Sequence, residues 1–219
     1  MTSNNDNRPL ALLVHGLWMS GFELGVLKHR LETEGRFRTA AFSYPSMTGS
    51  MADHVRSLVE FARAQRADQL HFVGHSLGGL VILKALQLTD DLPVGRAVLL
   101  GTPVQGSRAA AGVARWLPFG KAILGAAVNE EVLECTPRQW SGHREVGVIA
   151  GSMGLGLGRL FAHLNTDHDG TVLVEETRLP GAKDHIILPT SHTGMLFSAE
   201  VADQAACFLE CGEFRKGSG

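Results

Sequence analysis

Cysteine is scarce in this sequence, with Cys135, Cys207 and Cys211 the three present among 219 residues. An odd and sparse set of cysteines does not indicate a disulfide framework. Cys207 and Cys211 could share a helix face at i, i+4, but we interpret all three as small buried hydrophobic residues. A chain of this length can form one domain with one sizeable core.

The chain also lacks a charge surplus and a long apolar run. Its 20 Lys and Arg against 22 Asp and Glu give a net charge of −2, which indicates neither nucleic acid nor anionic lipid as a partner. No stretch approaches the ~18 apolar residues of a membrane span, and residues 1–8 lack the pattern of a signal peptide. We therefore expect a soluble, cytoplasmic protein without nucleic-acid partners or stable membrane anchoring.

Signatures of metal and cofactor binding are missing as well. No G-x-x-x-x-G-K-[ST] phosphate loop occurs, and the G-x-G-x-G pattern at residues 154–158 is weak and is interpreted as a flexible loop. His163, Asp167, His168 and Asp169 crowd one segment but lack a firm zinc-ligand pattern. We expect no cofactor and no metal.

What the sequence does contain is an alternation of strand and helix signals. Short apolar runs predict strands at residues 10–15, 37–44, 69–74, 96–101, 145–151 and 185–188. Apolar residues at helical spacing predict helices at residues 22–34, 52–66, 77–88 and 199–209. This order predicts an α/β fold in which a mostly parallel sheet has helices on both faces. Ligands in such sheets bind at the carboxyl ends of the strands.

A serine motif lies at one such strand end. Gly74-His75-Ser76-Leu77-Gly78 fits G-x-S-x-G between a predicted strand and a predicted helix. The turn is so tight that the residues two before and two after the serine must be small, as Gly74 and Gly78 are. The motif predicts that the Ser76 hydroxyl is exposed above the sheet as a nucleophile, at a helix N-terminus that favours negative charge. The alternative is a glycine-rich turn that only packs.

Several segments together resemble a known family. LVHG at residues 13–16, GHSLGG at residues 74–79, and LGTP followed by GS at residues 100–107 are similar to the bacterial lipase and esterase branch of the α/β-hydrolase family. The resemblance runs from about residue 10 to residue 197 and is weakest over residues 109–143. It implies the α/β-hydrolase fold, as a single domain over residues 1–219, and hydrolysis of acyl esters through an acyl-enzyme.

The nucleophile requires a base, which in this fold follows the acid near the C-terminus. The histidines downstream of Ser76 include His163, His168, His185 and His192. We select His192, because it follows the last predicted strand and because SHTGML resembles the histidine loop of the family. His185 lies at the start of that strand, at the wrong end of the sheet.

The acid is expected between the fifth strand and His192. Asp169 begins DGTV, which is similar to the pattern that carries the lipase acid, and the following glycine permits a sharp turn. Asp167 is the alternative on the same loop; Glu175, Glu176 and Asp184 are further candidates. The carboxylate is expected to hold the imidazole tautomer and to stabilise the imidazolium.

Two backbone N–H groups are expected to stabilise the oxyanion. One is that of Leu77, the residue after the nucleophile. By resemblance the other is that of Leu17, in the loop opened by His15-Gly16. His15 itself is interpreted as a buried, hydrogen-bonded structural residue.

Residues 104–143 break the alternation, and they return over the same edge of the sheet. Their largely small and apolar character favours a helical cap that contributes to an acyl pocket, although a plain pair of surface helices is the alternative. Trp18 and Met19, with Trp116 and Leu117, are the expected substrate-binding residues. The expected partner is a small acyl ester.

Two other functions remain open from the sequence. The same triad could transfer acyl groups or hydrolyse thioesters, and nothing in the sequence separates these from ester hydrolysis. A non-catalytic binding protein with this fold is disfavoured, because a candidate serine, acid and histidine are all present.

Overall fold

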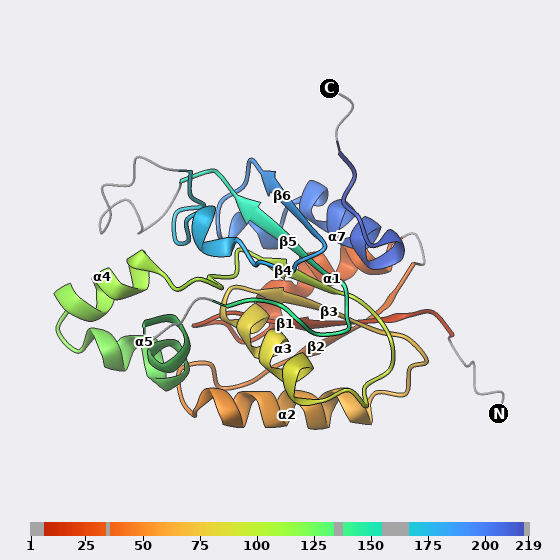
Figure 1. Cartoon of the computed structure of the whole chain (residues 1–219), viewed down its shortest axis with the longest axis horizontal. Helices are drawn as coiled ribbons and strands as arrows, with labels where there is room; N and C mark the ends of the chain where they lie inside the picture. The colour runs from red at the N-terminus through yellow and green to blue at the C-terminus, as the bar shows by residue number, and fades with distance from the viewer. Residues whose placement is uncertain (1–6, 34–35, 134–137, 155–166, 217–219) are drawn as a thin grey trace.

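The computed structural model describes residues 7–33, 36–133, 138–154 and 167–216 (Figure 1). A six-stranded sheet has the order β2-β1-β3-β4-β5-β6, and every neighbouring pair is parallel. Its strands are β1 (Leu10–Val14), β2 (Arg38–Phe42), β3 (Leu70–His75), β4 (Ala97–Leu100), β5 (Val146–Gly151) and β6 (Asp184–Leu188). The predicted fold class is confirmed.

Helices cover both faces of this sheet. They are α1 (Gly25–Glu32), α2 (Met51–Ala64), α3 (Leu77–Leu88) and α7 (Ala199–Cys211). Successive residues of a strand point to opposite faces, so Phe72 of β3 joins the apolar cluster under α2 and α3, whereas Val73 joins the cluster under α1 and α7. The central strands β1, β3, β4 and β5 are buried along their whole length, which explains their continuous apolar runs.

The segment between β4 and β5 forms two further helices. These are α4 (Arg108–Trp116) and α5 (Gly120–Val128), followed by a π-helical turn, Asn129–Leu133. Figure 1 shows α4 and α5 at the end of the molecule toward which the strand arrows point. Within α5, Gly125 has φ 79° and ψ 168° and interrupts the helix. A β-carbon added there would lie 2.6 Å from the Met47 carbonyl oxygen, so the close approach requires glycine.

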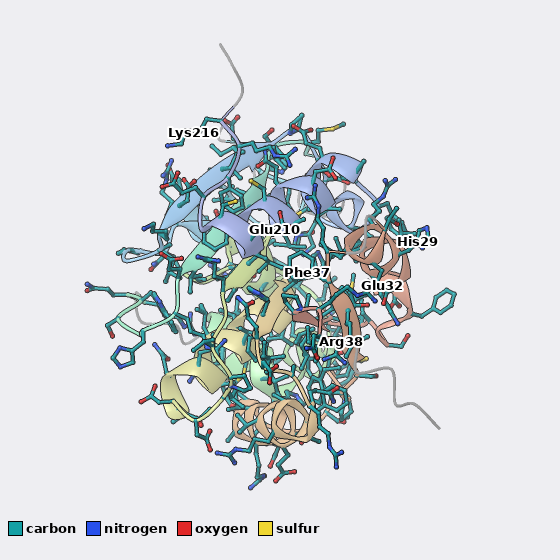
Figure 2. All side chains as sticks on the ribbon, turned by 90° about the vertical axis from the view of Figure 1, so that its right-hand side faces the viewer. His29, Glu32, Phe37, Arg38, Glu210 and Lys216 are labelled. Atoms are coloured by element: carbon teal, nitrogen blue, oxygen red, sulfur yellow. The ribbon has the colours of Figure 1, made fainter. Side chains whose placement is uncertain are left out.

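The opposite end, where the strands begin, faces the viewer in Figure 2. Arg38 opens β2 there, and the Thr39 hydroxyl beside it donates to Glu32 of α1 at 2.6 Å. His185 also lies at this end, as predicted, with its Nε2 3.0 Å from the Thr177 hydroxyl. This end is therefore remote from the carboxyl ends of the strands.

Three sequence-based interpretations concern residues outside the described ranges. These are Cys135, His163 and most of the glycine pattern at residues 154–158. Of the other cysteines, Cys207 is buried, as predicted, whereas Cys211 is exposed at the end of α7. Among the described residues, no helix is long and apolar enough to span a membrane.

Candidate active site

The turn from β3 to α3 places Ser76 in a strained backbone conformation. Ser76 has φ 53° and ψ −122°, a left-handed φ that side-chain-bearing residues rarely adopt. A β-carbon on Gly78 would lie 2.4 Å from the Val14 carbonyl oxygen, and one on Gly74 would lie 2.6 Å from the Gly79 Cα. The two flanking glycines are therefore a steric requirement of this turn, as the motif predicted.

His192 lies in the loop after β6 and is bonded twice to Asp169. Its Nδ1 lies 2.7 Å from Asp169 Oδ2, and its backbone N–H donates to the Asp169 carbonyl oxygen at 2.8 Å. Asp169 is 1% exposed, and its Oδ1 accepts from the backbone N–H groups of Thr171 and Val172 at 2.9 and 2.7 Å. A carboxylate only accepts, so Nδ1 carries the hydrogen and the neutral ring has its lone pair on Nε2.

A cavity of about 560 Å³ lies at the Ser76 turn. Ser76 and His192 both line it, together with Leu17, Trp18, Met19 and Leu77. The segment between β4 and β5 adds an apolar wall, made of Ala109, Ala110, Val113, Leu124, Val128 and Val132. The cavity thus combines a hydroxyl, an imidazole and an aliphatic surface.

Comparison with known proteins agrees with this geometry. A family model described as the alpha/beta hydrolase family matches residues 11–178. The chain belongs to this family. Over 100 residues it is 30% identical to Esterase YbfF of Escherichia coli (strain K12), a match that covers 40% of this chain and 37% of that protein.

Solved structures of this α/β-hydrolase fold are similar over most of the chain. Lipase BlEst2 of Bacillus licheniformis in its mature form has a TM-score of 0.68 at 18% identity, with 87% of each chain covered. Carboxylesterase CesB (YbfK) of Bacillus subtilis has a TM-score of 0.59 at 16% identity, with 94% of this chain and 85% of that one covered. At these identities the likeness concerns the fold.

The residues selected for the oxyanion hole of this α/β-hydrolase lie beside Ser76. Leu77 is the first residue of α3, so its N–H has no acceptor within the helix. Leu17 lines the cavity from the loop after β1. A β-carbon added to the preceding Gly16 would lie 3.0 Å from Ser76 Cβ, so glycine lets this loop approach the serine.

His15 has the structural role that was predicted for it. It is fully buried, its Nδ1 donates to the Gly16 carbonyl oxygen at 2.9 Å, and its Nε2 accepts from the Tyr44 N–H at 3.2 Å. Burial lowers the pKa of His15, which agrees with a neutral ring. Both ring nitrogens are occupied by the main chain.

The structure brings Asp169 to His192 and leaves Asp167 at the surface. The Asp167 side chain is exposed, and its backbone carbonyl accepts from the Val174 N–H at 3.0 Å. Between the two, His168 forms an isolated antiparallel β-bridge with Leu173. No group of three or more potential metal ligands occurs in the described part of the chain.

Trp116 and Leu117 correct the sequence-based expectation. Neither belongs to the cavity lining, to which α4 contributes Ala109, Ala110 and Val113. Trp116 is the last residue of α4, is 69% exposed, and lies under the Arg115 guanidinium. At 1.5 Å per residue it lies about 10 Å along the helix axis from Ala109. The expectation was wrong because apolar content does not reveal where a helix axis leads.

Two side-chain contacts at the site were not predicted from the sequence, although Trp18 itself was expected there. His75, the variable position of the G-x-S-x-G motif, lines the cavity, and its Nε2 lies 2.9 Å from the His192 carbonyl oxygen. Trp18 has a left-handed φ of 60°, and its Nε1 donates to the Ile123 carbonyl oxygen at 3.1 Å. Both contacts join segments about a hundred residues apart, which local patterns do not encode.

Proposed function

We propose that this α/β-hydrolase is a serine carboxylic-ester hydrolase, an esterase or lipase, with Ser76 as nucleophile, His192 as general base and Asp169 as the orienting acid. The observation that carries the proposal is the 2.7 Å contact between His192 Nδ1 and the buried carboxylate of Asp169. This bond leaves the Nε2 lone pair of His192 free to accept a proton at the cavity that Ser76 also lines.

In the proposed reaction, Ser76 Oγ attacks the ester carbonyl carbon while its proton passes to His192 Nε2. Collapse of the tetrahedral intermediate breaks the bond to the alcohol, which takes the proton from the imidazolium. Water then attacks the acyl-enzyme with His192 again as base, and releases the carboxylic acid and free Ser76. Asp169 stabilises the imidazolium in both steps without taking its proton.

The oxyanion of each tetrahedral intermediate is proposed to accept hydrogen bonds from the backbone N–H groups of Leu17 and Leu77. The strained Ser76 turn supports this assignment, because it sets the hydroxyl directly before the N-terminus of α3. The positive end of the helix dipole adds to the stabilisation.

The aliphatic cavity wall supports an ester with an apolar acyl chain as the substrate class. We propose that residues 104–143 act as a short cap over the single domain, and that Trp18 and Met19 contact the substrate. Glu23, the acidic side chain of the described lining, disfavours anionic substrates at the cavity. Esterases and lipases are also what the related proteins are named.

The test is a series of p-nitrophenyl esters of increasing acyl length, assayed with the wild type and Ser76→Ala. The proposal predicts hydrolysis by the wild type and a loss of at least about 10³-fold in kcat for Ser76→Ala. Activity that survives in Ser76→Ala contradicts it. A wild type that transfers the acyl group to added alcohols faster than to water would point to an acyltransferase instead.

A further inference from the structure

His75 is the last residue of β3 and immediately precedes Ser76. It is 1% exposed, and strand alternation directs its side chain to the same sheet face as Val73. This face is covered by α1 and α7, and the loop of His192 reaches it through Met195 and Leu196. The two histidines thus meet on one side of the sheet, although 117 positions separate them.

Two contacts join His75 to His192. His75 Nε2 lies 2.9 Å from the His192 carbonyl oxygen, and the ring centroids are 4.7 Å apart at 49°. A carbonyl oxygen only accepts, so His75 Nε2 carries the hydrogen and donates. Among the described residues, His75 Nδ1 has no hydrogen-bond partner; it faces Gly16, where an added β-carbon would lie 3.1 Å away. One ring nitrogen of His75 is therefore committed to the main chain of His192.

The backbone of His192 is consequently held on both sides. Its N–H donates to the Asp169 carbonyl, and its carbonyl accepts from His75. We propose that His75 is a positioning residue, which fixes the backbone of His192 against the strand that carries Ser76 and so sets the approach of the imidazole to the hydroxyl. This inference rests on the proposed function.

The geometry favours this role over simple filling of space. A buried imidazole with one unpaired nitrogen costs more free energy than an apolar side chain of similar size. The charges that reach His75 are those of His192, Asp169 and His15, and burial is the main reason that its pKa is lowered to about 3. His75 is therefore neutral during turnover and does not repel the imidazolium that forms on His192.

The experiment compares His75→Gln with His75→Met. The two side chains have nearly the same length and shape, but only glutamine retains an N–H donor. We expect His75→Met to lower kcat at least about tenfold with KM within about twofold, since misplacing a reacting group reduces turnover more than binding. His75→Gln is expected to restore most of the lost kcat. Equal kcat for the two folded variants overturns the inference, as does a change confined to KM.

A second measurement on the wild type does not depend on the folding of a variant. In long-range ¹H–¹⁵N spectra of histidine-labelled protein, His75 is expected to be the neutral Nε2–H tautomer at pH 5 and above. An Nδ1–H tautomer or an imidazolium at that pH overturns the inference, because neither agrees with a neutral Nε2 donor. Activity in Ser76→Ala would instead overturn the proposed function, so the two failures are distinguishable.

Discussion

The Trp18 indole N–H, from a residue that lines the cavity, donates to the Ile123 carbonyl oxygen of α5 at 3.1 Å, although the two are 105 positions apart in the chain. Trp18 follows Leu17, the proposed oxyanion donor, and Ile123 lies two residues before the break in α5. The non-helical Gly125 interrupts the regular bonding of α5, so the Ile123 carbonyl can accept from outside the helix. This bond ties the loop after β1 to the segment over the cavity.

Trp18→Phe keeps an aromatic ring but removes the indole donor. A hydrogen bond of this kind is worth about 1 kcal/mol, so kcat/KM is expected to fall about three- to tenfold. Steady-state kinetics on a medium-chain p-nitrophenyl ester measures this. Phe22→Leu is the control, because Phe22 is 91% exposed and lies outside the cavity lining. Equal losses in the two variants would show that the bond has no special role.

Asp169→Asn is expected to lower kcat greatly, whereas Asp167→Asn is not. An amide at position 169 cannot hold the His192 tautomer as the carboxylate does, and the loss in kcat is expected to be about 10³- to 10⁴-fold. Asp167→Asn alters an exposed side chain and is expected to stay within about twofold of the wild type. The kcat values of the two variants distinguish Asp169 from Asp167 as the orienting acid. The reverse pattern would assign that role to Asp167.

Gly78→Ala is expected to destabilise the fold. Its β-carbon would lie 2.4 and 2.5 Å from the Val14 and His15 carbonyl oxygens, which are backbone atoms that cannot rotate away. We expect the free energy of unfolding in urea to fall by more than about 2 kcal/mol. Gly25→Ala is the matched control: nothing lies within 4 Å of its added β-carbon, and it begins α1. That change should be neutral or stabilise by up to about 1 kcal/mol.

Stability should fall in mild acid because several histidines are buried as neutral rings. Burial lowers the pKa of His71 to about 4, with Arg96 and Arg144 adding to the shift. The unfolded chain, with a histidine pKa near 6.5, then binds more protons than the native state. The contribution of His71 is complete above pH ~6.5 and is lost as pH falls toward ~4, at up to about 1.4 kcal/mol per pH unit. Urea unfolding from pH 4.5 to 7 should show a shallower pH dependence for His71→Gln. An unchanged slope would contradict this account.

Much of the fold could be predicted because the relevant signals are local. The strand β5 begins within one residue of its predicted start, since buried parallel strands leave continuous apolar runs. The helix α3 has the predicted bounds, since the G-x-S-x-G motif fixes where this helix begins. The same motif identifies Ser76 as the candidate nucleophile. The pairing of His192 with Asp169 agrees with the order implied by the family resemblance.

What sequence reasoning missed depends on direction and on distant contacts. Trp116 was expected at the cavity because the segment is apolar, but α4 leads away from it. His75 occupies a motif position that tolerates any residue type, and its partner lies on another loop. Neither the direction of α4 nor the contact of His75 with the His192 loop produces a periodic or local pattern in the sequence.

Covalent labelling tests the central claim most directly. After incubation with a fluorophosphonate, the intact protein should gain one adduct by mass spectrometry, and peptide sequencing should place it on Ser76. The Ser76→Ala variant should gain none, and Asp169→Asn should label more slowly. An adduct on any other residue, or equal labelling of Ser76→Ala, would contradict the account.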